Sequence, residues 1–254
     1  MLAHPLAAQE DPSLTAEELF ELLDALEAQL DPPKLTAITG VASAHTAPHG
    51  VGFVGVAGTN NRERAQEDKI DGSLAFGLGL GNSEIVGAQI VVDVTSVKLN
   101  GFGDSGIVGV KLNRSFSAFG QPITAALSVD QLLPWGDSKV LNPSVTPVMT
   151  TRFEGPELLG TRWPLLFTTG YEYQAKTTYR DSNAFAGVGL GLTQNLGTSV
   201  AHNGEEWTIG AIASIPWVSG LGFGVAVSDV ANDNSDRRAI VTVSYARTLF
   251  GGSR

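Results

Sequence analysis

The segment Gly101–Gly106, with the sequence GFGDSG, has the glycine spacing of a dinucleotide-binding loop. Such a loop needs a strand before it and a helix after it, because the helix N-terminus receives the pyrophosphate. The residues that follow here, IVGVKL, are typical of another strand. The sequence therefore predicts a glycine-rich hairpin loop rather than a nucleotide site.

The same loop contains GDSG, which resembles the nucleophile motif of trypsin-like serine proteases, and ASAHTA faintly resembles their histidine motif. The resemblance implies a triad of Ser105, His45 and Asp93. Two departures count against it. Ile107 stands where that family has a second glycine, and His45 and Ser105 are too close in sequence for its two-barrel arrangement. We expect no enzyme.

Metal-ligand patterns are equally incomplete. His45 and His49 are four residues apart, but Pro48 lies between them and the stretch is not helical, so the usual helical zinc geometry is lost. The acidic stretch DVANDNSD lacks the glycine and the bidentate glutamate of a calcium loop. The chain has no cysteine, which excludes thiol catalysis and disulfides. No metal or cofactor is predicted.

The composition is mildly apolar without a membrane helix. Of 254 residues, 43% are hydrophobic and only 17% charged, and the mean hydropathy is +0.08. No run approaches the roughly 20 apolar residues that span a bilayer as a helix. The net charge of −10 argues against nucleic acid as a partner, because phosphate contacts need clustered Lys and Arg.

From about residue 50 onward the hydrophobic period is two. In SLAFGLGLG, large apolar residues alternate with Ser, Ala and Gly, and ITAALSVDQ, IVGAQIVVDVT and LGFGVAVSD repeat the pattern. About twelve such segments of roughly 9–11 residues follow one another, which is the length of a tilted membrane strand. Long and short connections roughly alternate between them. VGFVGVAGT, the first segment, has an ambiguous phase.

Three architectures could use these strands. A soluble sandwich or a small soluble barrel would leave the bare Gly, Ala and Ser face in water, where Lys, Glu, Thr and Asn are expected. A transmembrane barrel turns the large apolar face to lipid and the small or polar face inward. Trp135, Trp163, Trp207 and Trp217 all lie near strand ends, where interfacial aromatic residues belong. We therefore predict an all-β, antiparallel transmembrane β-barrel of about 12 strands at residues 50–250.

The ending RRAIVTVSYARTLF resembles the closing strand of bacterial outer-membrane β-barrels of the small porin-like class. Phe250 is out of phase with Val241, Val243 and Tyr245, and GGSR follows it where that class usually stops. The resemblance implies the outer membrane as location, both termini in the periplasm, and contact with the lipid bilayer and the outer-membrane assembly machinery.

The N-terminal region has a different pattern. Residues 1–12 fit a disordered tail and the remnant of a secretory signal equally well. Residues 13–34 predict a short acidic amphipathic periplasmic helix. Its stripe consists of Leu19, Leu22, Leu23, Leu26 and Leu30. A coiled-coil seam with a second copy or a periplasmic partner, docking on the barrel, and plugging of the pore would each cover this stripe.

The predicted lumen is the main functional surface. The strand phase points seven polar side chains inward: Gln89, Asp93, Lys111, Asn113, Ser128, Asp130 and Glu172. They would tune ion passage or form a salt-bridged plug. The predicted function is passive diffusion of small solutes or ions. The alternatives are a structural or adhesive barrel with a blocked lumen, a membrane-embedded hydrolase, and a soluble β-rich binding or self-assembling protein.

Overall fold

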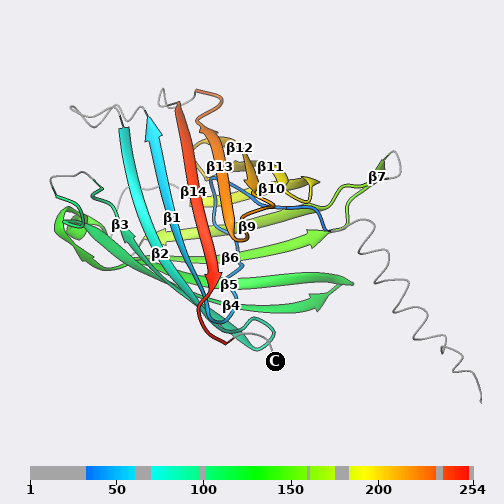
Figure 1. The fold of residues 1–254 in the computed structure, drawn as a ribbon, viewed down its shortest axis with the longest axis horizontal. Coiled ribbons are helices and arrows are strands. Elements are labelled where there is room, and N and C mark those ends of the chain that lie inside the picture. Colours follow the sequence, from blue (N-terminus) through cyan, green and yellow to red (C-terminus); the bar gives the residue numbers. More distant parts are fainter. Residues whose placement is uncertain are drawn as a thin grey trace, which may run out of the picture. The chain divides into compact units, whose positions relative to one another are not determined.

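The computed structural model describes residues 33–60, 70–97, 101–158, 161–174, 183–232 and 237–251. They form a closed barrel in which every strand is antiparallel to both neighbours (Figure 1). Its twelve strands are β1 (Val51–Asn60), β2 (Ile70–Asn82), β3 (Val86–Val94), β4 (Gly106–Ala118), β5 (Gln121–Trp135), β6 (Ser144–Phe153), β9 (Leu165–Gln174), β10 (Asn183–Thr193), β11 (Leu196–His202), β12 (Trp207–Ser214), β13 (Leu221–Ser228) and β14 (Arg238–Thr248).

The all-β antiparallel barrel predicted from the alternation is thereby confirmed. The predicted tail at 1–12 and the helix with its leucine stripe lie outside the described residues. Among the described residues, no helix is both long and apolar enough to cross a bilayer.

The connections differ between the two ends of the barrel. The β2–β3, β4–β5 and β10–β11 turns are tight, and we call their end the short-turn end. The β6–β9 connection at this end carries the small hairpin of β7 (Glu157–Leu158) and β8 (Thr161–Arg162). The opposite, long-loop end holds the GFGDSG loop and the 3₁₀ helix η1 (Gly136–Val140). Residues Gly101–Ser105 of the GFGDSG segment therefore lie in the connection between β3 and β4, and Gly106 begins β4.

Strand pairing fixes the phase of the first strand, which the sequence left ambiguous. β14 and β1 close the barrel, with Val51 opposite Thr248 and Thr59 opposite Ile240. Phe53 is opposite Gly77 of β2, and its ring covers the space that a side chain at Gly77 would need. Phe53 thus lies on the inner face and Val54 and Val56 on the outer face.

Residues 34–48, which we call the inner segment, run inside the barrel instead of joining its wall (Figure 1). The segment begins at the short-turn end, where the Leu35 amide donates to the Thr193 carbonyl at 2.9 Å. It returns to that end before β1, because the Gly50 amide donates to the Gly79 carbonyl at 2.9 Å. Gly50 makes the turn with φ of +74°, a conformation that favours glycine.

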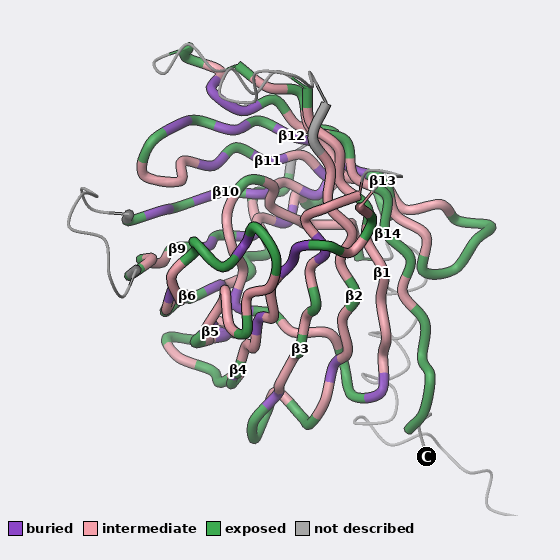
Figure 2. The backbone as a smooth tube through the Cα atoms, turned by 90° about the vertical axis from the view of Figure 1, so that its left-hand side faces the viewer, coloured by how far each residue is buried: buried purple, intermediate pink, exposed green. Residues whose placement is uncertain are grey.

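Burial inside the barrel is uneven. Along β6, β9, β10, β11 and β12, many inner-face residues are buried, and they alternate with more exposed outer-face residues (Figure 2). Inner-face residues of β14 and β1 are less covered: Ser244 is exposed, and Gly55, Ala57 and Thr59 are only partly buried. The inner segment therefore fills one side of the lumen and leaves the side of β14 and β1 accessible to solvent.

Candidate functional site

The wall of the barrel accepts hydrogen bonds from the main chain of the inner segment. The Thr39 amide donates to Ser199 Oγ of β11 at 3.0 Å. The Ala44 amide donates to Thr150 Oγ1 of β6 at 2.8 Å. The Ala47 amide donates to Gln89 Oε1 of β3 at 2.8 Å, on the other side of the lumen.

Wall side chains also donate to the carbonyl groups of the inner segment. Thr168 Oγ1 of β9 donates to the Ala42 carbonyl at 3.1 Å. Lys111 Nζ and Asn113 Nδ2 of β4 donate to the carbonyls of Ser43 and Ala44 at 2.9 and 3.1 Å. Three successive carbonyl groups inside the lumen thus have partners, which buried main-chain groups require.

Glycines of the wall make room for the backbone of the inner segment. A methyl group at Gly189 would overlap the Ala37 carbonyl, and one at Gly79 would overlap the Ala47 carbonyl. At Gly197 it would lie 2.6 Å from the Leu35 oxygen, and at Gly187 2.7 Å from Ile38 Cγ2. The strand faces that are rich in Gly, Ala and Ser in the sequence are therefore the surface that contacts the inner segment.

A small apolar cluster holds the middle of the inner segment. Ala44 is fully buried and packs with Val148 of β6 and Phe185 of β10, which are 2% and 8% exposed. Val41, Ala42 and Ala126 pack against the same cluster. The interior thus combines main-chain hydrogen bonds with local hydrophobic packing.

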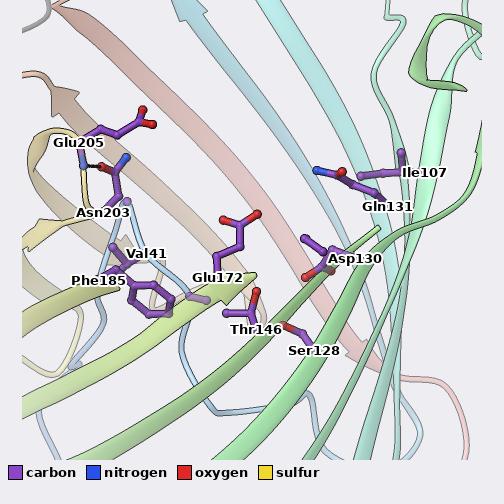
Figure 3. Close-up of a pocket in the computed structure, with 13 residues that line it drawn as sticks. Val41, Ile107, Ser128, Asp130, Gln131, Thr146, Glu172, Phe185, Asn203 and Glu205 are labelled. Atoms are coloured by element: carbon purple, nitrogen blue, oxygen red, sulfur yellow. Dashed lines mark hydrogen bonds between the residues drawn. The ribbon is translucent and has the colours of Figure 1, made fainter. Parts of the chain in front are cut away.

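A cavity of about 380 Å³ opens between the inner segment and the long-loop end (Figure 3). Gly40, Val41 and Ala42 contribute to its lining. Asp130, Glu172 and Glu205 line it from different strands and a loop, and the described lining residues include no Lys or Arg. The remaining lining residues are Ile107, Ser128, Gln131, Ser144, Thr146, Phe185 and Asn203.

A β-bulge in β5 brings two consecutive side chains to this cavity. Val110 is opposite Val129, but Val108 is opposite Leu132, so Asp130 and Gln131 both oppose Gly109. Gln131 adopts a positive φ of 60°, and it lines the cavity beside Asp130. Bulges re-aim side chains in this way. Strict alternation in the sequence would have placed Gln131 on the outer face.

The structure places the seven side chains proposed for the lumen in three settings. Gln89, Lys111 and Asn113 bind the inner segment. Ser128, Asp130 and Glu172 line the cavity. Asp93 lies on the same face of β3 as Gln89, and its Oδ1 atom is buried without a hydrogen bond among the described residues. Their role in passage stays a prediction.

Sequence reasoning missed the inner segment itself, together with Gln131, Asn203 and Glu205 of the cavity. The wall glycines were the available signal. Gly187, Gly189 and Gly191 occupy successive inner-face positions of β10. A water-filled lumen does not require three such positions without a side chain.

The four tryptophans are divided between the two ends. Trp135 ends β5 and donates to the Gly103 carbonyl at 2.9 Å, and Trp207 begins β12 and packs on His202. Trp163 precedes β9 with the Lys34 ammonium 4.6 Å from its ring centre, and Trp217 is 82% exposed in the β12–β13 turn. Their placement at the bilayer interface stays a prediction.

The protease-like residues do not form a triad. Ser105 Oγ lies 2.8 Å from Thr95 Oγ1, which is 3.0 Å from Ser138 Oγ. No hydrogen bond among the described residues joins Ser105 to His45 or Asp93. The described residues also contain no group of three His, Cys, Asp or Glu side chains that could hold a metal ion.

His45 of the inner segment is a titratable group whose surroundings affect its charge. Its side chain is exposed to the solvent of the lumen, but the surrounding wall crowds it. This partial desolvation lowers the pKa of His45, and the nearby Lys111 ammonium lowers that pKa further. The neutral imidazole is therefore the favoured form in the folded protein.

The outer face of the barrel is apolar. Val56, Phe76, Leu112, Val225 and Val241 are each about half exposed although they are large hydrophobic residues. A closed barrel leaves no unpaired strand edge, and this apolar exterior suits lipid. The architecture is that of an outer-membrane β-barrel. It agrees with the sequence resemblance and with the predicted location in the bacterial outer membrane.

No protein-family model matches the sequence, and no curated protein sequence matches it. Solved structures similar to this chain include the KdgM porin in complex with disordered oligogalacturonate. The TM-score is 0.49, with 12% identity over 76% of this chain and 98% of that chain. For the outer membrane protein Omp33 of Acinetobacter baumannii the TM-score is 0.46, with 11% identity over 78% and 97%. The translocator domain of the autotransporter NalP from Neisseria meningitidis has a TM-score of 0.35 and 12% identity over 91% and 95%. These similarities concern the fold and not the activity.

Proposed function

We propose that this protein is a narrow diffusion channel of the outer membrane that passes small solutes and favours cations. The observation that carries the proposal is the cavity at the long-loop end, whose described lining residues include Asp130, Glu172 and Glu205 and no Lys or Arg. Charged rings of one sign concentrate counter-ions at the mouth of a pore. We expect solutes to pass from this cavity along the side of β14 and β1, because the inner-face residues there are less buried than those of the opposite wall.

The orientation follows from the same architecture. Outer-membrane barrels have short periplasmic turns and longer extracellular loops. We place the short-turn end, where the inner segment begins and β14 ends, at the periplasm, and the acidic cavity toward the outside. Solutes would thus meet Asp130, Glu172 and Glu205 before they reach the inner segment.

Single-channel recording in planar bilayers tests this function. The purified protein should give discrete current steps, and a KCl gradient should give a reversal potential of the sign expected for cation preference. Asp130→Asn combined with Glu172→Gln should move that potential toward zero, because the substitutions remove two carboxylates from the cavity lining. Glu154→Gln is the matched control, because Glu154 is 82% exposed and pairs with Arg162 in the β6–β9 connection.

The second candidate is a structural barrel with a closed lumen. It is favoured by the hydrogen bonds that tie the inner segment to β3 and β4 on one side and to β6, β9 and β11 on the other. Absence of current steps across many insertions of correctly folded barrel would support this candidate and contradict the channel.

A further inference from the structure

The wall of the lumen recognises the inner segment mainly through its main chain, and Thr39 and Thr46 add side-chain hydrogen bonds to Ser199 and Asn113. Between Thr39 and Ala47, three amides donate to Ser199, Thr150 and Gln89. Three carbonyls accept from Thr168, Lys111 and Asn113. Main-chain groups are common to every peptide, so these contacts do not depend on the side chains of the segment. The partners come from five different strands, and they form a continuous surface only in the closed barrel.

We propose that this surface is a binding site for an extended polypeptide, and that residues 34–48 occupy it as a resident ligand that a second peptide of the same kind can replace. The site consists of the hydrogen-bonding side chains named above and the wall glycines beneath the segment. We call it the main-chain track. It is a property of the lumen that does not depend on solute passage.

The shape of the track defines the class of peptide. Gly189, Gly197 and Gly79 lie directly beneath carbonyl groups of the inner segment, so the backbone approaches the wall more closely than any residue with a Cβ would allow. The resident sequence TAITGVASAHTA is rich in small residues, and only Val41, Ala42 and Ala44 join an apolar cluster. The ligand class is therefore an extended peptide with small side chains.

The inner segment stays in the main-chain track because it is covalently joined to the barrel as well as because of its contacts. It continues through Gly50 into β1, and its effective concentration at the track is therefore in the millimolar range typical of short tethers. A free peptide cannot compete until the resident is weakened. The inner segment belongs to no strand of the barrel, so weakening it leaves the pairing of the wall intact.

The test weakens the resident and leaves the wall unchanged. Ala44→Pro removes the amide that donates to Thr150, because proline has no N–H. A fluorescent peptide with the sequence of residues 34–48 is then added to the detergent-solubilised full chain, and its anisotropy is measured. It should bind the Ala44→Pro protein at least about tenfold more tightly than the wild type, whose track is occupied.

N-methylated peptides separate main-chain recognition from other binding. A methyl group on the amide corresponding to Ala44 changes no side chain, but it should weaken binding about tenfold or more, because one buried acceptor loses its donor. Methylation of the amide at Thr36 is the control, because none of the described hydrogen bonds uses that amide. Equal affinities of the two methylated peptides would overturn the proposal.

A wall variant provides the complementary control. Gly189→Ala, added to the Ala44→Pro protein, should abolish peptide binding, because the methyl group would occupy the place of a peptide carbonyl. Gly55→Ala should not affect binding, because the nearest atom is 3.9 Å away. A second weakened variant, Thr39→Pro with Ala44→Pro, covers the case in which one substitution does not release the resident. Failure of the peptide to bind either variant, in barrels that still change mobility on boiling, would overturn the main-chain track.

Discussion

At the scale of single residues, the inner-wall glycines beneath the inner segment have little freedom to change. Gly189→Ala would place a methyl group onto the Ala37 carbonyl, so either the wall or the inner segment must move. Overpacking of this kind typically costs about 1–3 kcal/mol. We expect the urea midpoint of unfolding, followed by tryptophan fluorescence in detergent micelles, to fall for this variant.

Gly55→Ala is the matched control for that prediction. Gly55 also lies on the inner face, but on the accessible side, where the closest atom is the Val243 carbonyl oxygen at 3.9 Å. Its unfolding midpoint should stay within error of the wild type. Equal losses for the two variants would mean that any inner-face methyl group is harmful and that the inner segment has no special fit.

His45 predicts how the seating of the inner segment depends on pH. Partial desolvation and Lys111 lower its pKa in the folded state, so the unfolded chain binds a proton more readily. The stabilisation is complete above the unfolded value of about 6.5 and is lost as the pH falls through the folded pKa. Among the described residues, Lys111 acts on His45 directly, and Asp130 of β5 acts on Lys111.

The measurement compares unfolding midpoints at pH 8 and pH 5. His45→Gln should reduce the loss of stability between these two values, because glutamine does not titrate. The carboxylates of the barrel titrate in both proteins, so their contribution cancels in the comparison. A pH dependence that is unchanged by His45→Gln would show that the imidazole has no part in seating the segment.

At the scale of elements, the inner segment depends on hydroxyl groups of the wall. Thr150 accepts from the Ala44 amide and pairs with Thr168 Oγ1 at 2.9 Å, and Thr150, Thr168 and Ala44 are all buried. Thr150→Val keeps the shape but leaves the Ala44 amide without a partner, which costs about 1–3 kcal/mol. The unfolding midpoint should fall accordingly. Thr242→Val on the inner face of β14 makes the same chemical change with no hydrogen bond to the inner segment, and it should be close to neutral.

Sequence periodicity predicted the strands well because lipid and lumen impose opposite demands on alternate residues. It predicted poorly where one element adapts to another. The inner segment has no period of its own, because its backbone is held by side chains from distant strands such as Gln89 and Ser199. The bulge at Asp130 and Gln131 breaks the alternation that made β5 recognisable. Both features depend on closure of the barrel, which no local pattern records.

At the scale of the whole molecule, the barrel has two surfaces that suit different solvents, lipid on the outside and water on the inside. The outer face carries large apolar side chains that are exposed, such as Val241 at 54% and Val225 at 55%. The inner face carries small and polar side chains, and part of it is covered by the chain itself. Neighbouring residues of one strand therefore experience lipid and water in turn, and substitutions at adjacent positions can separate the two environments.

Val241 and Thr242 of β14 provide that comparison. Val241 points outward in the first half of β14, and Thr242 points to the accessible side of the lumen opposite Gly224. Arginine on the lipid face costs about 2–4 kcal/mol at the bilayer midplane, whereas arginine in the lumen can keep its hydration. Val241→Arg should reduce folding into lipid vesicles, measured as the fraction of protein that changes mobility on boiling. Thr242→Arg should fold normally and, in the proposed channel, lower the preference for cations. A soluble sandwich would behave in the opposite way, because an arginine at an exposed position such as Val241 would then be tolerated and improve solubility.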